Sequence, residues 1–376
     1  MSERARTRTW RVEDGAVHVY RLFDIAEAVD LARAEVLVAA PTSRLRLEGA
    51  QSATALDIPR PPLHLVLGPR TVTLASGPCA VEASAHVFDF GVASILYKLP
   101  IAPGTALEEL LPLAEELLSG TTTALDDAAR RETEELGRAL APALEGPHVW
   151  GGHETYQVIY VRSFDAPAPA TELLASAPIA RLLLGETSAT PLSDSEQGDV
   201  LQRRFSYLEE DLAVIDWNSA FVVEPSGVQD IPDLLEFATA HLLELRFYDA
   251  LLDRELNVIY DELEISGRTL AALFTRRYRR LQRRTAALLL EISEMIERLE
   301  NAVKIVGDFY LARLYQGAVR RFRLPAWEET VLRKQHLLAE VNALLGSSAD
   351  TNRGQLMELA VILLILGELL LAIRVH

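Results

Sequence analysis

Cysteine and positive charge are both scarce in this sequence. Cys79 is the only cysteine among 376 residues, so the chain forms no intramolecular disulfide and no metal site built from several cysteines. Lysine and arginine number 37 against 54 aspartates and glutamates, which gives a net charge of −17. Nucleic acids are bound through clustered cations, so this acidic balance argues against general nucleic-acid binding. A single cysteine is compatible with a reducing cytoplasm, where we expect the protein to be.

Short motifs of the common enzyme classes are absent as well. The sequence has no Walker loop, no GxGxxG, HExxH or GxSxG motif and no EF-hand loop. The usual phosphate, zinc, serine-nucleophile and calcium chemistries therefore lack their local signatures. We expect a non-enzymatic protein with no catalytic, cofactor-binding or metal-binding residue. The first residues include arginines but no apolar segment follows them, so no cleaved secretory signal is expected.

The first 165 residues alternate between strand and helix patterns. Residues 17–23 follow a period of two, which predicts a strand, and Asp24 then begins a short helical pattern. Two β-rich segments, Leu63–Leu67 and Thr71–Ala75, are separated by residues 68–70, a spacing typical of a hairpin. We expect an α+β domain in which an antiparallel sheet has helices over one face. The other elements predicted here are helices at Leu107–Leu118 and Leu125–Leu144 and a strand at Thr155–Phe164.

The sequence divides into three parts. We predict the α+β domain over residues 1–165, a linker and bridging segment over 166–230, and a coiled-coil domain of long helices with an apolar C-terminal helix over 231–376. The bridging segment contains β-branched and aromatic residues that predict one strand before Asp216 and another at Ala220–Val223.

The helical part has the most regular pattern in the chain. Apolar residues recur with a period of 3.5 over Ile231–Leu263 and again over Phe274–Val306, on either side of the breaker at 266–267. This pattern predicts a helical hairpin or an oligomeric coiled coil, and in an antiparallel hairpin residues whose numbers sum to about 532 lie opposite each other. Further apolar side chains need another helix to cover them, which predicts a homo-oligomer. They are Leu234, Phe237, Phe247 and Leu251.

A basic stripe lies on the predicted second helix, opposite its apolar seam, and two interpretations of it remain open. In the first, it binds an anion such as RNA, a lipid headgroup or an acidic partner, because the arginine guanidinium suits phosphate well. In the second, it is neutralised within the chain, because the predicted register sets it opposite Asp249, Asp253 and Glu255. The stripe consists of Arg276, Arg277, Arg279, Arg280, Arg283 and Arg284.

Asp249 occupies a seam position in an otherwise aliphatic repeat. An unpaired carboxylate there is costly to desolvate, and the predicted register places Arg283 and Arg284 within about one helical turn of it. We therefore interpret Asp249 as a buried polar residue that sets the register of the hairpin, and not as a catalytic group.

The apolar segment near the C-terminus has a borderline length for a membrane span. It covers 18 residues, Leu356–Ile373, where about 20 are needed to cross a bilayer, and Glu368 lies inside it. The same residues keep a heptad spacing that suits a helix buried in a bundle. We expect either a protein that is peripheral to or anchored at the inner membrane, or one that buries this segment itself. The segment is defined by Glu358, Leu359, Leu363, Leu366, Glu368, Leu370 and Ile373.

Several motifs are spread over residues 80–376. They are the Asp-Phe-Gly at 89–91, the long helical pair, the run at 306–311, the turn at 324–327 and the run at 357–368, where two glutamates ten residues apart bracket aliphatic residues. Together they resemble the family required for meiotic nuclear division, domain of unknown function 155. The resemblance implies a non-enzymatic, membrane-associated scaffold, since eukaryotic relatives lie at the mitochondrial inner membrane and support translation. Met357-Glu358-Leu359 stands where that family usually has Leu-Glu-Trp.

Two polar clusters are candidate sites. His148, Trp150, His153 and Glu154 surround a Gly-Gly pair, but they supply too few ligands for a metal, so a turn into the next strand is the plainer interpretation. The second cluster, residues 216–218, has the sequence Asp-Trp-Asn, which is typical of a turn whose polar side chains bond the backbone.

The function predicted from these features is that of a scaffold or interaction protein that self-associates through its coiled-coil helices. Its expected partners are a further copy of itself, a protein that the sequence does not name, and a membrane surface. One alternative is an ion-transport protein similar to magnesium channels, but that family requires a Gly-Met-Asn motif and two membrane spans, which the sequence lacks. The other alternative is an enzyme that uses the N-terminal α+β domain.

Overall fold

The computed structural model describes residues 8–38, 41–47, 56–120, 123–266, 276–305 and 309–343, and the chain divides into two compact units. Residues 1–247 and 297–327 form the first, which we call the sheet unit. Residues 248–296 and 328–376 form the second, which we call the helical unit. The apolar C-terminal segment lies outside the described residues, so the choice between a membrane span and a buried helix stays a prediction.

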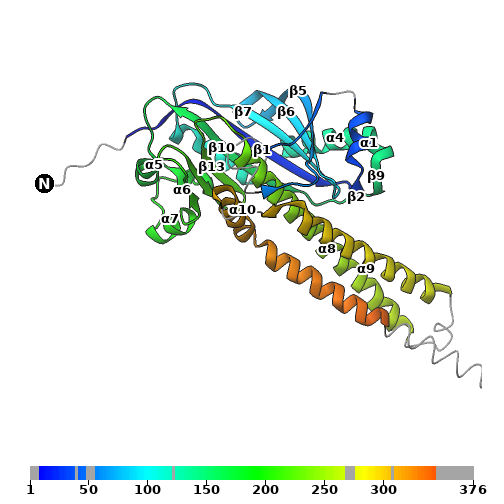
Figure 1. Cartoon of the computed structure of the whole chain (residues 1–376). Helices are drawn as coiled ribbons and strands as arrows, with labels where there is room; N and C mark the ends of the chain where they lie inside the picture. Colours follow the sequence, from blue (N-terminus) through cyan, green and yellow to red (C-terminus); the bar gives the residue numbers. More distant parts are fainter. Residues whose placement is uncertain are drawn as a thin grey trace, which may run out of the picture. The chain divides into compact units, whose positions relative to one another are not determined.

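A ten-stranded sheet forms the core of the sheet unit. Its central strand, β1 (Arg11–Asp24), pairs in antiparallel fashion with β10 (Glu154–Phe164) on one side and with β7 (Val92–Pro100) on the other. Figure 1 shows these strands beside β6 (Gly77–Val87) and β5 (Leu63–Leu74). The strand order is β11-β12-β13-β10-β1-β7-β6-β5-β3, with β8 paired to β1. The shorter strands are β3 (Thr42–Arg44), β8 (Thr105–Ala106), β11 (Arg204–Phe205), β12 (Leu212–Ile215) and β13 (Ser219–Val223).

The large N-terminal sheet and the C-terminal helices confirm a mixed α and β protein, but the sheet is not purely antiparallel. β13 runs parallel to β10, with Ala220 opposite Val158. The strands predicted near Asp216 are confirmed as β12 and β13, and they extend the N-terminal sheet. Residues 166–230 therefore belong to the sheet unit and do not bridge two domains. The helices that precede these strands are α5 (Ala170–Ser176), α6 (Ile179–Leu184) and α7 (Asp194–Val200).

The hairpin predicted at residues 68–70 is wrong in its position. β5 continues through these residues, and its pairing with β6 shifts register between Val66 and Gly68. Gly68 has a φ of +84°, a left-handed conformation that only glycine adopts without strain. The glycine thus makes a bulge inside one long strand, and the chain reverses after Leu74, which pairs with Gly77.

The helix predicted directly after Asp24 is also wrong. Residues 26–29 form strand β2 (Ala26–Val29), which pairs with β9 (Leu144–Pro147). Helix α1 (Leu31–Leu37) begins later, where the Asp30 carboxylate accepts hydrogen bonds from the amides of Ala32 and Arg33. The capping aspartate is thus Asp30 and not Asp24, because the backbone groups of β2 are already used by β9.

Helices cover both faces of the sheet, whereas the sequence predicted one. α4 (Thr123–Leu140) packs on β1, β5 and β7. On the opposite face, Phe237 of α8 (Asp230–Ser266) makes edge contacts with Phe88 and Phe90 at ring distances of 5.2 and 5.9 Å. The remaining elements of this unit are β4 (Leu56–Asp57), η1 (Leu107–Leu110), α3 (Leu111–Leu118), η2 (Ala141–Ala143), β14 (Lys304–Ile305) and α10 (Tyr310–Arg321).

The long helices predicted from the heptad pattern are confirmed as α8 and α9 (Arg276–Ala302). Figure 1 shows their parts in the helical unit beside a third helix, over 324–343. Tyr248 bonds Glu291 at 3.1 Å, and Arg284 bonds Glu255. The residue numbers in each pair sum to 539, one heptad more than the predicted 532, because the turn lies beyond residue 266. Supercoiling of these helices stays a prediction.

The apolar patch predicted to drive oligomerisation is mostly covered within the chain. Leu234, Phe237 and Phe247 are buried in the sheet unit, and Leu251 of the helical unit is half-buried. The heptad pattern did not show that the first half of α8 packs on a sheet. Within the described ranges, no helix is long and apolar enough to cross a membrane.

Candidate functional site

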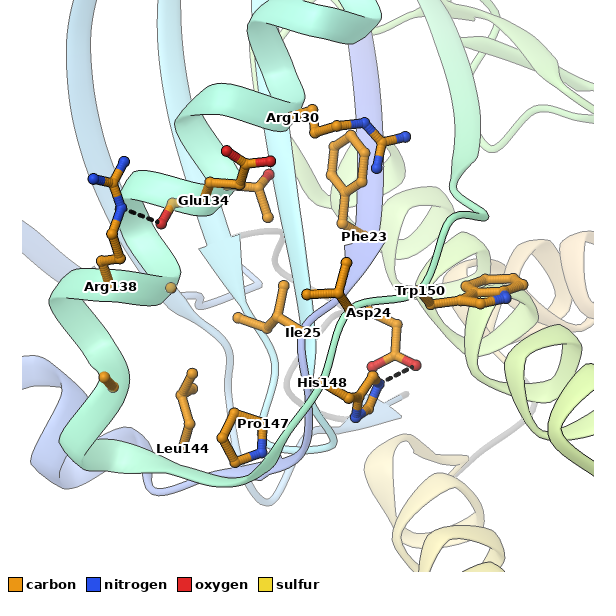
Figure 2. Close-up of a pocket in the computed structure, with 14 residues that line it drawn as sticks. Phe23, Asp24, Ile25, Arg130, Glu134, Arg138, Leu144, Pro147, His148 and Trp150 are labelled. Carbon is orange, nitrogen blue, oxygen red and sulfur yellow. Dashed lines mark hydrogen bonds and ion pairs between the residues drawn. The ribbon is translucent and has the colours of Figure 1, made fainter.

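A pocket of about 430 Å³ opens where β1 ends, between helix α4 and the segment that precedes β10 (Figure 2). We call it the His148 pocket. A mostly apolar cavity of this size with a few polar groups is typical of small-molecule sites. It is lined by Phe23, Asp24, Ile25, Arg130, Thr133, Glu134, Gly137, Arg138, Ala141, Leu144, Pro147, His148, Val149 and Trp150.

An aspartate and a histidine meet in the wall of this pocket. The Asp24 carboxylate is buried, and its Oδ2 lies 3.0 Å from His148 Nε2. The other ring nitrogen, Nδ1, lies 3.1 Å from the carbonyl oxygen of Gly146. Both partners are acceptors, so we assign both ring nitrogens as donors, which is the charged imidazolium form.

The electrostatics of the pair agree with this assignment. Burial by itself lowers the pKa of His148, but the hydrogen bond and the charge of Asp24 outweigh it and raise this pKa above its ordinary value. Burial raises the pKa of Asp24, and the contact with His148 opposes that shift. Both ring nitrogens of His148 face acceptors, so the imidazole is held in the wall of the pocket.

Aromatic rings hold the segment that carries His148. The imidazole stacks on Phe247 at a ring distance of 4.5 Å and an angle of 3°. Trp150 meets the same phenyl ring edge-on at 5.6 Å. A Cβ atom at Gly152 would come within 2.4 Å of the Trp150 ring, so the close approach of the indole requires glycine there.

Helix α4 supplies the rim of the pocket. The Arg130 guanidinium lies 5.2 Å from the centre of the Phe23 ring, and Arg138 Nε donates to the backbone carbonyl of Glu134. In the part of the chain that the structure describes, neither arginine has an ion-pair partner. A Cβ atom at Gly137 would meet nothing within 4 Å, so this position on the helix faces open space in the pocket.

The cluster predicted around the Gly-Gly pair separates in the structure. Figure 2 shows His148 beside Asp24 and Trp150 to one side of them. His153 stacks on Phe23 at 5.5 Å, and Glu154 begins β10 and pairs with Arg246. The sequence did not single out Asp24 and Phe23 as site residues; the one available signal was a carboxylate that ends a strongly apolar strand.

The second predicted cluster is a structural turn. Asp216 is buried and pairs with Arg321 of α10. Its backbone amide donates to the carbonyl of Ser219, so residues 216–219 close the turn between β12 and β13. Trp217 packs edge-on against Phe322 at 6.5 Å.

The basic stripe on α9 is described only in part. Arg284 pairs with Glu255, as the internal-neutralisation interpretation predicts, while Arg280 and Arg283 are exposed. The side chains of Arg276, Arg277 and Arg279 lie outside the described residues. Anion binding by the stripe stays a prediction.

The partner predicted for Asp249 is wrong. Lys334 of the third helix lies 2.7 Å from Asp249 Oδ1 and 2.6 Å from Asp253 Oδ1. The prediction placed only the two hairpin arms in contact, so it had no third helix to supply a cation. The proposed role of Asp249 in setting register is not tested by this contact.

No metal site emerges from the residues that can be described. Among them, no group of three or more histidine, cysteine, aspartate or glutamate side chains is placed to hold an ion. The sheet, its two helical faces and the His148 pocket define an α+β domain with a small-molecule-sized pocket at the end of its central strand.

The chain belongs to the family described as "Uncharacterized protein MJ0711, N-terminal domain", which it matches over residues 14–230. It is 23% identical over 179 residues to the uncharacterized protein MJ0711 of Methanocaldococcus jannaschii, which covers 46% of this chain and 53% of that protein. The chain thus spans about half the length of the curated relative it matches. No solved structure matches it.

This result corrects the resemblance drawn from the sequence. The family shown is a divergent, uncharacterized one, and not the family required for meiotic nuclear division. The matched residues include the whole lining of the His148 pocket. The motifs that carried that resemblance are mainly aliphatic runs and heptads, which many unrelated proteins share.

Proposed function

We propose that this protein is a non-enzymatic binding protein whose His148 pocket holds a small ligand with an apolar body and one negatively charged group. The observation that carries the proposal is the bonding of His148. Its two nitrogens are both engaged, by Asp24 and Gly146, in the wall of an otherwise apolar cavity of about 430 Å³. Such a wall supports binding, and the other carboxylate of the lining, Glu134, lies on the exposed side of α4.

The chemistry of the ligand follows from the lining. Phe23, Ile25, Leu144 and Pro147 offer apolar and aromatic contacts to its body. Two arginines of α4, Arg130 and Arg138, outnumber the one carboxylate of that rim, Glu134, and Asp24 is already paired with His148. Arginine binds carboxylates and sulfonates through two parallel hydrogen bonds, which favours an acidic group on the ligand at the α4 side.

Filling the pocket from Gly137 tests this proposal. The probe is 8-anilinonaphthalene-1-sulfonate, an aromatic anion whose fluorescence rises in apolar sites. We expect saturable binding to the full chain and a loss of affinity of about tenfold or more in Gly137→Leu, because each 1.4 kcal/mol of lost contact is a factor of ten. Gly137→Ala is the matched control, since it leaves the cavity open and stabilises the helix by about 0.5 to 1 kcal/mol.

The two variants separate binding from folding. Both replace a helical glycine, so both should unfold at or above the temperature of the parent protein. Equal affinity in Gly137→Leu and Gly137→Ala would show that the probe binds elsewhere and would overturn the proposal. Arg130→Met should weaken the sulfonate probe but not a neutral naphthalene.

We also propose that the helical unit is the part through which the protein meets a second copy of itself, a protein partner or a membrane surface. Large apolar side chains face solvent in this unit: Tyr260, Leu290, Leu332 and Leu337. Exposed apolar side chains on long helices are typical of surfaces that a further helix covers. The oligomeric state of the full chain in solution is the test of this second role.

A further inference from the structure

A second hollow of the sheet unit lies on the face of the sheet opposite α4, beside the first turns of α8. It consists of two adjoining cavities of about 330 and 320 Å³, which share Lys98 and Gln229 as lining residues. We call the two together the polar cleft. None of its lining residues belongs to the His148 pocket.

Cross-strand pairing gathers cationic and imidazole side chains on this face of the sheet. His18 of β1 lies directly opposite Lys98 of β7, and His64 of β5 lies opposite His86 of β6. Lys98 in turn lies opposite Glu82 of β6, four residue pairs along the ladder from His86. Because side chains alternate along a strand, these residues all point to one face.

Part of this polar set is satisfied within the protein. His86 Nδ1 lies 2.7 Å from Glu236 Oε2 of α8, and both side chains are buried. Burial opposes protonation of His86, but the Glu236 charge raises its pKa above the ordinary value. Burial, together with the charge of His86, lowers the pKa of His64 to about 4, and Ser43 Oγ lies 3.2 Å from its Nδ1.

Three polar groups that line the cleft are left without partners. In the part of the chain that the structure describes, neither Lys98 nor the Asp233 carboxylate makes a hydrogen bond or an ion pair. The His18 side chain is 3% exposed, and its Nδ1 atom has no hydrogen-bond partner. His18 is buried, and buried polar groups are nearly always bonded, whereas Lys98 and Asp233 are half-buried and line the open cavity. A group from outside the chain that enters the cavity can therefore bond all three.

The two unpaired charges lie near each other without touching. Lys98 is close enough for its charge to lower the pKa of Asp233, yet no ion pair joins them. Burial outweighs the opposing charges of His86 and Lys98 and raises the pKa of Asp233 to about 7. An anion at Lys98 alone would leave Asp233 uncompensated, and a cation at Asp233 alone would leave Lys98 uncompensated.

We propose that the polar cleft binds a small zwitterion of the α-amino-acid class, with its ammonium group at Asp233, its carboxylate at Lys98 and a hydrogen bond to His18. Such a ligand carries its two charges a few atoms apart, so it can pair with Lys98 and Asp233 at once. The neutral His64 and the paired His86 then form a polar wall without adding net charge. This site goes beyond the proposed function, since it lies in a different cavity from the His148 pocket.

Thermal unfolding and calorimetry on the full chain test the proposal. The probes are the twenty proteinogenic L-amino acids, added one at a time. We expect at least one to raise the unfolding temperature and to bind saturably. Its decarboxylated amine and its deaminated acid should each bind about tenfold more weakly or worse, because each loses one charge-assisted hydrogen bond.

Variants of the protein complete the test. Asp233→Asn and Lys98→Met should each weaken binding of the same amino acid by about tenfold or more, while Lys304→Met, an exposed lysine on β14, should not. Lys98→Gln is the second variant in case the methionine impairs folding. The proposal is overturned if no amino acid binds, or if binding survives in both cleft variants. It is also overturned if inorganic phosphate binds to Asp233→Asn as tightly as the amino acid binds to the parent protein. Amino-acid binding that persists in Gly137→Leu would show that the amino acid does not bind in the His148 pocket.

Discussion

At the scale of single residues, the sheet unit buries charge on both of its faces and pairs most of it. The alternation along β1 turns Arg21 toward α4, where its Nε donates to Asp126 Oδ1 at 2.6 Å. It turns His18 and Tyr20 toward α8. A buried ion pair roughly balances its desolvation, whereas a desolvated charge without a bonded partner is costly, so the ionisation of Asp233 opposes folding.

The pH dependence of stability should reveal Asp233. Its pKa rises from 3.8 to about 7 on folding, so the folded state holds the proton more tightly and stability from this group is lost as pH rises from about 4 through 7. The difference bounds the effect at about 4 kcal/mol, and partial exposure should reduce it to about half. Asp233→Asn should therefore raise the unfolding temperature at pH 8 and leave it nearly unchanged at pH 4.5.

Calorimetric scans of the parent and the variant at both pH values check this expectation. Glu108→Gln is a suitable control, because that carboxylate is exposed at the start of η1. An equal change at both pH values would mean that Asp233 acts through packing or helix capping and not through its ionisation.

At the scale of elements, the helix over 324–343 is joined to α8 by one lysine that contacts two carboxylates. Lys334 Nζ lies 2.7 Å from Asp249 and 2.6 Å from Asp253. Gln335 adds hydrogen bonds to α9, at Ser293 Oγ and at the carbonyl of Leu289. The third helix thus bonds to both α8 and α9, and it supplies the cation that pairs with Asp249.

Removal of Lys334 should expose the cost of burying Asp249. Lys334→Met leaves a part-buried carboxylate without its cation and should lower the free energy of unfolding by about 1 to 3 kcal/mol. Adding Asp249→Leu should restore most of the loss, since it removes the uncompensated charge. Arg333→Met, on the exposed neighbouring residue, should have little effect.

A double-mutant cycle in denaturant measures this coupling. Additive effects of Lys334→Met and Asp249→Leu would contradict the contact. A comparable coupling between Asp249 and Arg283 would instead support the register predicted from the sequence.

At the scale of the whole molecule, the two units have different tasks in our proposals. The sheet unit contains the His148 pocket and the polar cleft, while the helical unit presents its apolar side chains to partners. Because α8 runs through both units, its first and last parts have different surroundings. It packs on a sheet at its start and on helices at its end.

We expect the full chain to self-associate through the helical unit. Light scattering should give a mass of at least twice 41.6 kDa, and Leu290→Glu together with Leu337→Glu should shift it toward the monomer. Leu290 is 62% exposed; Leu208, 65% exposed in the sheet unit, supplies the matched control Leu208→Glu. A monomer at all micromolar concentrations would remove self-association and leave a separate protein or a membrane as the partner of this unit.

Periodic patterns allowed much of the fold to be predicted. The strand at Glu154–Phe164 and the helices α3, α8 and α9 were all predicted near their observed bounds. Their apolar residues repeat over many turns or alternations, so the pattern survives whatever packs against it. The segment at 26–29 was mispredicted because it is short and its conformation depends on pairing with β9.

The candidate sites depended on tertiary structure almost entirely. His148 was noticed in the sequence, but its partner Asp24 is 124 positions away and meets it only because β2 and β9 pair. Lys98 and Asp233 of the polar cleft were not noticed, since each resembles an ordinary surface charge. Composition and local periodicity determine an acidic α and β protein with long helices. Which faces of the sheet are covered, and which buried charges lack partners, is decided only when distant segments meet, because desolvation and pairing depend on neighbours in space.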